Sequence, residues 1–178
     1  MIDFTPIIEL IKEGWRTAIP WFTVDEYEAG VLLRVGKVIT DERGNPIEYG
    51  PGIHFKFPLL DNPITTSIAT ETVNVSSQSL TTLDNQDIVV SSAIKCNVSN
   101  VGIYLIKVTD VQNALSDVTQ GKIKQVVMSK NWEDVKSEET EKEITELVKK
   151  EAKKWGIRVE YVTITTLAKL RSIRIIQN

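Results

Sequence analysis

The stretch that decides the fold is Gly50-Pro-Gly-Ile-His-Phe-Lys-Phe-Pro58. In it Ile53, Phe55 and Phe57 alternate with His54 and Lys56, which is the pattern of a strand with one buried face. Pro51 between two glycines favours a rigid turn before this strand. We therefore expect a β-strand that starts at a fixed turn and carries His54 on its polar side.

The flanking residues extend this β pattern up to about residue 100, with many β-branched residues and turn formers. Further strands are expected over 27–38, as one long strand or a strand pair, and over 72–79 and 87–98. Turns are expected over 41–46 and 83–87 because Asp and Asn concentrate in both stretches, with Gly and Pro in the first.

From residue 110 the period of the apolar residues changes from two to that of a helix. Asp110 can cap a first helix whose apolar face is interrupted near Gly121, and Ser137 can cap a longer one that ends at Gly156. A strand follows from residue 157, and a last short helix is expected from Leu167 to Ile176. Strands followed by helices indicate an α+β fold.

The first residues form an amphipathic pattern from Phe4 to Phe22, which we assign to a helix that Pro20 ends or kinks near Ile19. Its charged residues, such as Glu9 and Lys12, fall on the opposite side. Trp15 and Trp21 suit a lipid headgroup boundary, so the helix could lie on a membrane. It could equally pack on its own domain.

Composition excludes several classes of protein. The 178 residues, 42% of them hydrophobic, suffice for one good core, and 21 basic against 24 acidic side chains give a net charge of -3. We expect no general nucleic-acid binding from that balance. No apolar run is long enough to span a bilayer, and a secretory signal is not expected. A single cysteine fits a reducing compartment.

We expect no enzyme, no metal site and no cofactor. His54 and Cys96 are the only residues of their kinds, so a Cys/His zinc site cannot form within one chain, and both are interpreted as structural. Asp84, Asn85 and Asp87 lack the twelve-position pattern of a calcium loop and indicate a turn. The Gly50-Pro-Gly turn is interpreted as structural, and it could aim Ile53 to Phe57 at a membrane or at a neighbour.

Four segments, in this order, resemble one known family. They are Val24-Asp-Glu-Tyr-Glu-Ala-Gly-Val-Leu-Leu-Arg-Val-Gly-Lys37, Gly50-Pro-Gly-Ile-His-Phe-Lys-Phe-Pro58, Leu80-Thr-Thr-Leu-Asp-Asn85 and Trp155-Gly-Ile-Arg-Val159. Together they resemble the stomatin/prohibitin/flotillin family, also called the SPFH or band-seven family, across about residues 24 to 166.

The resemblance implies a half-barrel-like antiparallel sheet with packed helices over 24–178, preceded by the amphipathic segment 1–23. It also implies a membrane-anchored homo-oligomer that scaffolds lipid microdomains or regulates membrane proteases and channels. Members usually begin with a hydrophobic anchor and continue into a long coiled coil. Here the amphipathic segment stands at the anchor position and the chain stops at Asn178.

Our main hypothesis is a peripheral scaffold on the cytoplasmic face of a membrane. The residues expected to contact lipid are Phe4, Ile7, Ile8, Ile11, Trp15, Ile19, Trp21 and Phe22. The apolar stripe expected to contact other copies is Leu167, Leu170, Ile173 and Ile176. The competing hypothesis is a soluble adaptor or inhibitor that joins or caps another SPFH assembly or its protease partner.

Overall fold

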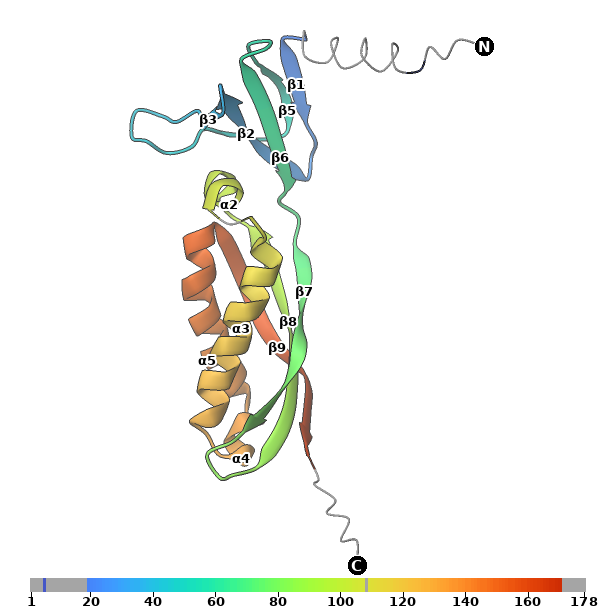
Figure 1. The fold of residues 1–178 in the computed structure, drawn as a ribbon, viewed down its shortest axis with the longest axis vertical. Helices are drawn as coiled ribbons and strands as arrows, with labels where there is room; N and C mark the ends of the chain where they lie inside the picture. Colours follow the sequence, from blue (N-terminus) through green and yellow to red (C-terminus); the bar gives the residue numbers. More distant parts are fainter. Residues whose placement is uncertain (1–4, 6–18, 108, 171–178) are drawn as a thin grey trace, which may run out of the picture. The chain divides into compact units, whose positions relative to one another are not determined.

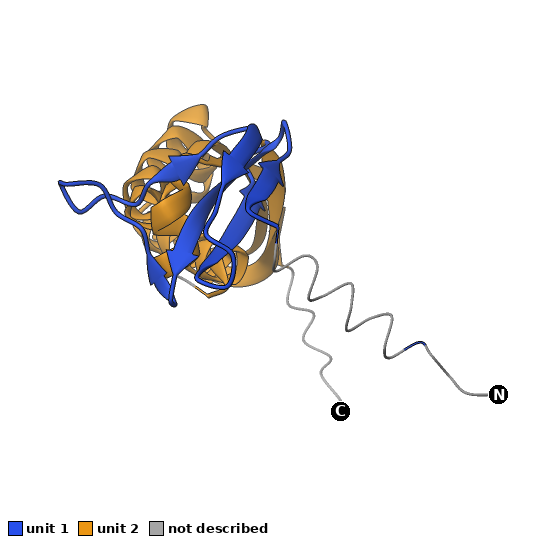
Figure 2. Cartoon of the chain, turned by 90° about the horizontal axis from the view of Figure 1, so that it is seen from above, with its two compact units in different colours: residues 1–69 blue, residues 70–178 orange. Residues whose placement is uncertain are grey.

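The computed structural model describes Thr5, residues 19–107 and residues 109–170 of the chain. The chain divides into two compact units, which are residues 1–69 (unit 1) and residues 70–178 (unit 2), coloured separately in Figure 2. The division falls after Ala69, inside the stretch 24–178 that the sequence assigned to one domain.

Unit 1 is built from short antiparallel strands. Their bounds are β1 Trp21–Val24, β2 Glu28–Arg34, β3 Lys37–Val38, β4 Glu48–Tyr49, β5 Gly52–Phe55 and β6 Asp61–Ser67. Strand β1 pairs with β5, and β2 pairs with β3, β4 and β6. Gly30 permits the close approach of β2 and β6, because a Cβ atom there would lie 2.7 Å from the carbonyl oxygen of Ile64. A small core forms around Phe22, Val24 and Leu32.

Unit 2 is a three-stranded antiparallel sheet with helices on one face (Figure 1). Its strands are β7 Glu71–Thr81, β8 Asp87–Val98 and β9 Ile157–Lys169, in the order β7-β8-β9. Its helices are α2 Val101–Lys107, α3 Val111–Met128, α4 Trp132–Val135, α5 Glu138–Ala152 and the 3-10 turn η1 Lys153–Trp155. Every second residue of β8 is buried against α3 and α5, which gives unit 2 the larger core.

The ends of the two long helices confirm the predicted caps. The Asp110 side chain accepts from the amide of Asn113 before α3, and the Ser137 side chain accepts from the amide of Thr140 at the start of α5. Gly156 ends η1 in the left-handed conformation with φ 76°. Helix α3 runs through Gly121 without a break, and Gly121 is not among its buried residues.

Two expected helices disagree with the structure. Residues 19 and 20 are not helical and Trp21 begins β1, so an N-terminal helix reaching Phe22 is wrong. Strand β9 continues to Lys169, so Leu167 lies in a strand rather than in a C-terminal helix. The other residues of the first helix, namely Phe4, Ile7, Ile8, Ile11 and Trp15, and the last two of the second, Ile173 and Ile176, lie outside the described residues.

Replacing Gly156 with alanine should lower the free energy of unfolding by at least about 1–3 kcal/mol, because φ is positive there. A Cβ atom would also lie 2.3 Å from the carbonyl oxygen of Asn100. Gly121→Ala is the matched control, since no heavy atom lies within 4 Å of a Cβ there and alanine favours a helix. Urea unfolding should show Gly121→Ala gaining stability, and a similar loss in both variants would contradict this account.

Candidate functional site

Pairing between β1 and β5 sorts their side chains onto two faces. The register places Trp21 opposite Phe55, Phe22 opposite His54 and Thr23 opposite Ile53. Residues directly opposite in an antiparallel pair share a face, and successive residues alternate between faces. Trp21, Phe55, Thr23 and Ile53 therefore lie on one side, and Phe22 and His54 lie on the other.

The side with Phe22 and His54 is the inner one. Phe22 is only 8% exposed, and its ring centroid lies 5.6 Å from that of Tyr49 and 5.4 Å from that of His54. The half-buried His54 ring also donates through Nε2 to the carbonyl oxygen of Gly50 at 2.7 Å. His54 is a packed structural residue here. Its expected exposure on the polar side of the strand is wrong, as is the assignment of Phe22 to a lipid-contacting helix.

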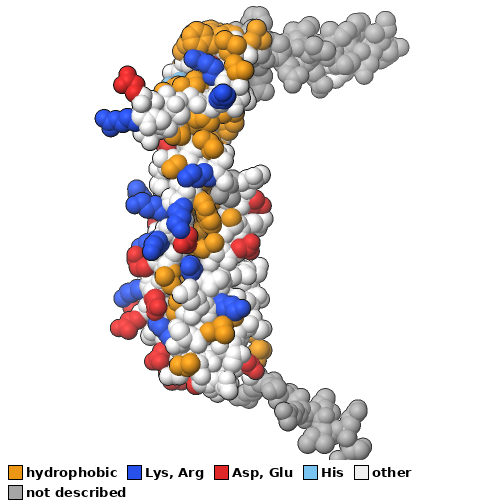
Figure 3. All heavy atoms as spheres, turned by 60° about the vertical axis from the view of Figure 1, so that its left-hand side comes forward, with side chains coloured by type: hydrophobic (Ala, Val, Ile, Leu, Met, Phe, Trp, Pro, Cys, Tyr) orange, Lys and Arg blue, Asp and Glu red, His pale blue; other side chains and the backbone are white. Residues whose placement is uncertain are grey.

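The opposite side is exposed, and we use the name apolar face for its apolar residues together with the exposed apolar residues of the turns after β2 and β5. Its members are Trp21, Val35, Ile53, Phe55, Phe57, Leu59 and Leu60. Their exposed fractions run from 48% for Phe57 to 85% for Leu59. Figure 3 shows hydrophobic side chains gathered over unit 1, at the top of the view. The alternation predicted from the sequence is present, but the apolar set points outward.

Local contacts link several members of the apolar face. The rings of Phe55 and Phe57 pack edge to face with centroids 5.3 Å apart. The turn from Phe57 to Asp61 follows, and the amide of Val35 donates to the carbonyl oxygen of Leu60 at 2.9 Å. Sequence reasoning missed Val35, Leu59 and Leu60, because single apolar residues in turns carry no periodic signal.

An ion pair between the exposed Arg34 and the buried Asp61 fixes the turn that presents these residues. Arg34 donates through Nε to Asp61 Oδ1 at 2.8 Å and through Nη2 to Asp61 Oδ2 at 3.0 Å. The amide of Phe57 donates to the same carboxylate at 2.9 Å, and the Arg34 guanidinium lies 4.8 Å from the Phe57 ring centroid. The hydrogen bond from Arg34 holds the pKa of Asp61 below its ordinary value, against the opposing effect of burial.

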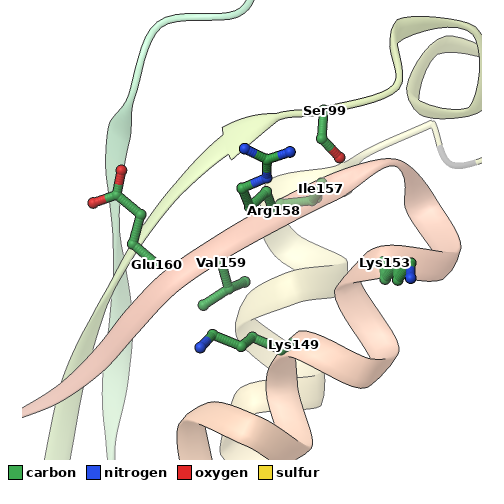
Figure 4. A pocket seen from close by; sticks show the side chains of 7 residues that line it. All are labelled: Ser99, Lys149, Lys153, Ile157, Arg158, Val159 and Glu160. Carbon is green, nitrogen blue, oxygen red and sulfur yellow. The ribbon is translucent and has the colours of Figure 1, made fainter.

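A separate groove in unit 2, of about 520 Å³, runs beside the start of β9 (Figure 4). Lys149, Lys153 and Arg158 line it, but Figure 4 shows the ends of their side chains pointing apart. Lys149 forms an ion pair with Glu146 at 2.9 Å. The groove thus brings basic groups near one another without converging them on one point.

The other residues considered for catalysis or metal binding, Cys96 and Asp84, have structural roles in the described part of the chain. Burial, with the nearby Glu71 and Glu160 carboxylates, raises the pKa of the Cys96 thiol to about 11, so it stays protonated at neutral pH. Asp84 sits in the expected turn and accepts from the amide of Trp132 at 3.0 Å. Across Thr5, 19–107 and 109–170, no cluster of three potential metal ligands occurs.

Comparison with known proteins agrees with this fold. Residues 22–169 match the SPFH domain / Band 7 family. The chain belongs to that family. Among the helices that the structure describes, none is long and apolar enough to cross a membrane.

Similar proteins include two uncharacterized archaeal ones. This SPFH chain is 27% identical over 143 residues to a protein of Methanocaldococcus jannaschii, with 79% of this chain and 68% of that protein covered. It is 28% identical over 143 residues to one of Archaeoglobus fulgidus, with 79% of this chain and 55% of that protein covered.

A shorter match is to the "Modulator of FtsH protease HflC" of Escherichia coli, 34% identical over 83 residues. That match covers 47% of this chain and 25% of the Escherichia coli protein, so this SPFH chain spans a minor part of HflC.

Asp61→Asn should lower the free energy of unfolding by about 1.5–3 kcal/mol, because the buried side chain loses its charge and one of the two oxygens that accept from Arg34 and the Phe57 amide. The lowered pKa of Asp61 means that its contribution is present above the unfolded pKa of about 3.9 and disappears as the pH falls through the folded value.

Urea unfolding from neutral pH to about pH 3 measures both effects. The stability difference between the parent and Asp61→Asn should shrink toward the acid end. A difference that stays constant over this range would show that the Asp61 carboxylate does not act through its charge.

Proposed function

We propose that the protein is a non-enzymatic scaffold that rests on the cytoplasmic face of a membrane and regulates membrane proteins there. The observation that carries this proposal is the apolar face of unit 1. Monomeric soluble proteins rarely expose a contiguous apolar patch larger than a few hundred Å². A patch above that size marks a surface for lipid or for another protein. Family membership and the similarity to HflC support the regulatory role.

Energetics favour a reversible contact with the bilayer interface. Fully burying one large apolar side chain contributes about 1.5–3 kcal/mol, and each member of the apolar face is already partly covered by its own domain. The β1–β5 pairing and the Arg34–Asp61 bridge hold the face in place, so little ordering cost opposes binding. Several copies on one assembly would turn this modest affinity into stable attachment.

The backbone conformation of two turn residues independently supports contact of the apolar face with a membrane. Val35 and Leu59 adopt positive φ values of 51° and 69°, where glycine or asparagine is favoured over apolar residues. Val35 precedes Gly36 in the tight turn between β2 and β3, a position that commonly holds asparagine. Exposed apolar side chains at these strained positions have no local structural benefit. We attribute them to contact with the membrane interface.

The lipid-contacting residues proposed from the sequence are revised accordingly. Trp21 stays in the set as a member of the apolar face, while Phe22 leaves it because its side chain is buried. The segment before Ile19 remains a proposal as an interfacial helix that would enlarge the contact area.

Assembly and partners are also proposals. The Escherichia coli relative is named as a modulator of the protease FtsH, and we propose by similarity that this chain acts with another SPFH protein on a membrane protease. For homo-oligomer contacts, Leu170 is half exposed and remains a candidate. Leu167 is partly buried against the core of unit 2, so it is less available to a partner.

Liposome co-sedimentation tests the membrane contact. Ile53→Glu with Phe55→Glu should abolish most pelleting with vesicles, because two charges would enter the apolar boundary. The matched control is Leu83→Glu with Met128→Glu, which alters exposed apolar side chains of unit 2 and should pellet as the parent does. Equal pelleting of the face variant and the parent would refute the bilayer contact and favour the adaptor hypothesis, in which flotation requires an SPFH partner.

A second test uses the strained turns. Val35→Asn with Leu59→Asn should raise the midpoint of thermal unfolding, because asparagine tolerates positive φ better than valine or leucine. The same variant should bind vesicles more weakly. If binding fell together with stability, a folding defect rather than a lost membrane contact would explain the result.

A further inference from the structure

Unit 1 contains a groove of about 390 Å³ beside the apolar face. Its lining residues come from β1 and from Ile19 before it, from β6, and from Lys56 after β5. The amide of Lys56 donates to the carbonyl oxygen of Pro20 at 2.8 Å, which fixes the backbone of Lys56 next to β1. The groove is therefore formed by ordered strands.

The polar groups of this groove are suited to an anion. Among the lining residues, Lys56 carries an ammonium group, Thr23 and Thr65 carry hydroxyls, and Trp21 carries an indole N–H, all of which can donate to an anion. Among the described residues that line the groove, none carries a carboxylate. Within the described ranges, no ion pair of the Lys56 ammonium is found, and the nearby Asp61 is already held by Arg34. Lys56 is thus a half-buried cation with charge to offer a ligand.

Trp21 indicates which kind of anion would bind, because it belongs both to the groove and to the apolar face. A ligand in the groove would lie at the border of that face, so its charged group would meet Lys56 while an attached apolar part met Trp21 and Phe55. A phospholipid has this chemistry, whereas a free phosphate uses only the polar half.

We propose that this groove binds the phosphate of an anionic phospholipid headgroup, with Lys56 as its charge partner. The proposal rests on the proposed function, since it names the lipid chemistry that the apolar face would meet. The chain as a whole has a net charge of -3, so attraction to an anionic bilayer has to come from a local site of this kind.

Binding of the full chain to vesicles of phosphatidylcholine alone, and with phosphatidylglycerol added, tests the proposal. The parent should bind the anionic vesicles more tightly. Lys56→Gln should weaken binding to them about fivefold and leave binding to neutral vesicles unchanged, as expected for one lysine at a charged surface. The loss should shrink as salt is raised. Lys37→Gln is the control, because Lys37 is an exposed cation of unit 1 outside the groove.

The outcomes separate the two proposals. If the parent binds neither vesicle, the membrane contact itself is refuted. The headgroup site is refuted if the parent binds both kinds of vesicle equally and Lys56→Gln has no effect. It is also refuted if Lys56→Gln and Lys37→Gln lose affinity equally, and in either case the membrane contact stands. The third measurement is a titration with inorganic phosphate in the absence of vesicles. If phosphate binds and the binding depends on Lys56, the ligand is a soluble anion and not a lipid. Unchanged thermal unfolding of Lys56→Gln would exclude a folding defect.

Discussion

Antiparallel pairing between β1 and β5 is the interaction on which the candidate site depends. It places Phe22 and His54 together on the inner side and Trp21 and Phe55 together on the outer side. Phe22, His54 and Tyr49 then form an aromatic cluster that anchors the pair to the rest of unit 1. With the inner side filled by these rings, the apolar residues of the outer side have no place in this core.

The turn after β5 depends on a second constraint of a different kind. Asp61 is almost fully buried, and a buried carboxylate needs partners for its charge and its lone pairs. Arg34 and the amide of Phe57 supply them, and in doing so they fix the path of the chain between Phe57 and Asp61. The need to pair the buried Asp61 carboxylate thus holds Leu59 and Leu60 at the surface. This explains how a small β unit keeps apolar side chains exposed without rearranging to cover them.

Unit 2 has a conventional division between core and surface, and β9, one of the two edge strands of its sheet, is partly protected. The amide of Val162 donates to Thr145 Oγ1 at 3.0 Å, and the amide of Ile164 donates to Glu141 Oε1 at 2.8 Å. Both acceptors come from α5 and occupy amides of β9 that an added strand would need. Neighbouring copies that meet this stretch of β9 would therefore make side-chain contacts in place of strand pairing.

The sequence by itself determined the α+β class, β8, the caps of α3 and α5 at Asp110 and Ser137, and the stop at Gly156, because these features depend on neighbours within a few residues. It also contained the alternation in β5. Only the tertiary structure decided that β1 is a strand, since Phe22 continues the helical period of the residues before it. The tertiary structure also decided which side of β5 faces the core. A period of two defines two faces of a strand, but the partner strands decide which face is filled. Phe22 and Tyr49 fill the side of His54, so Ile53 and Phe55 face outward.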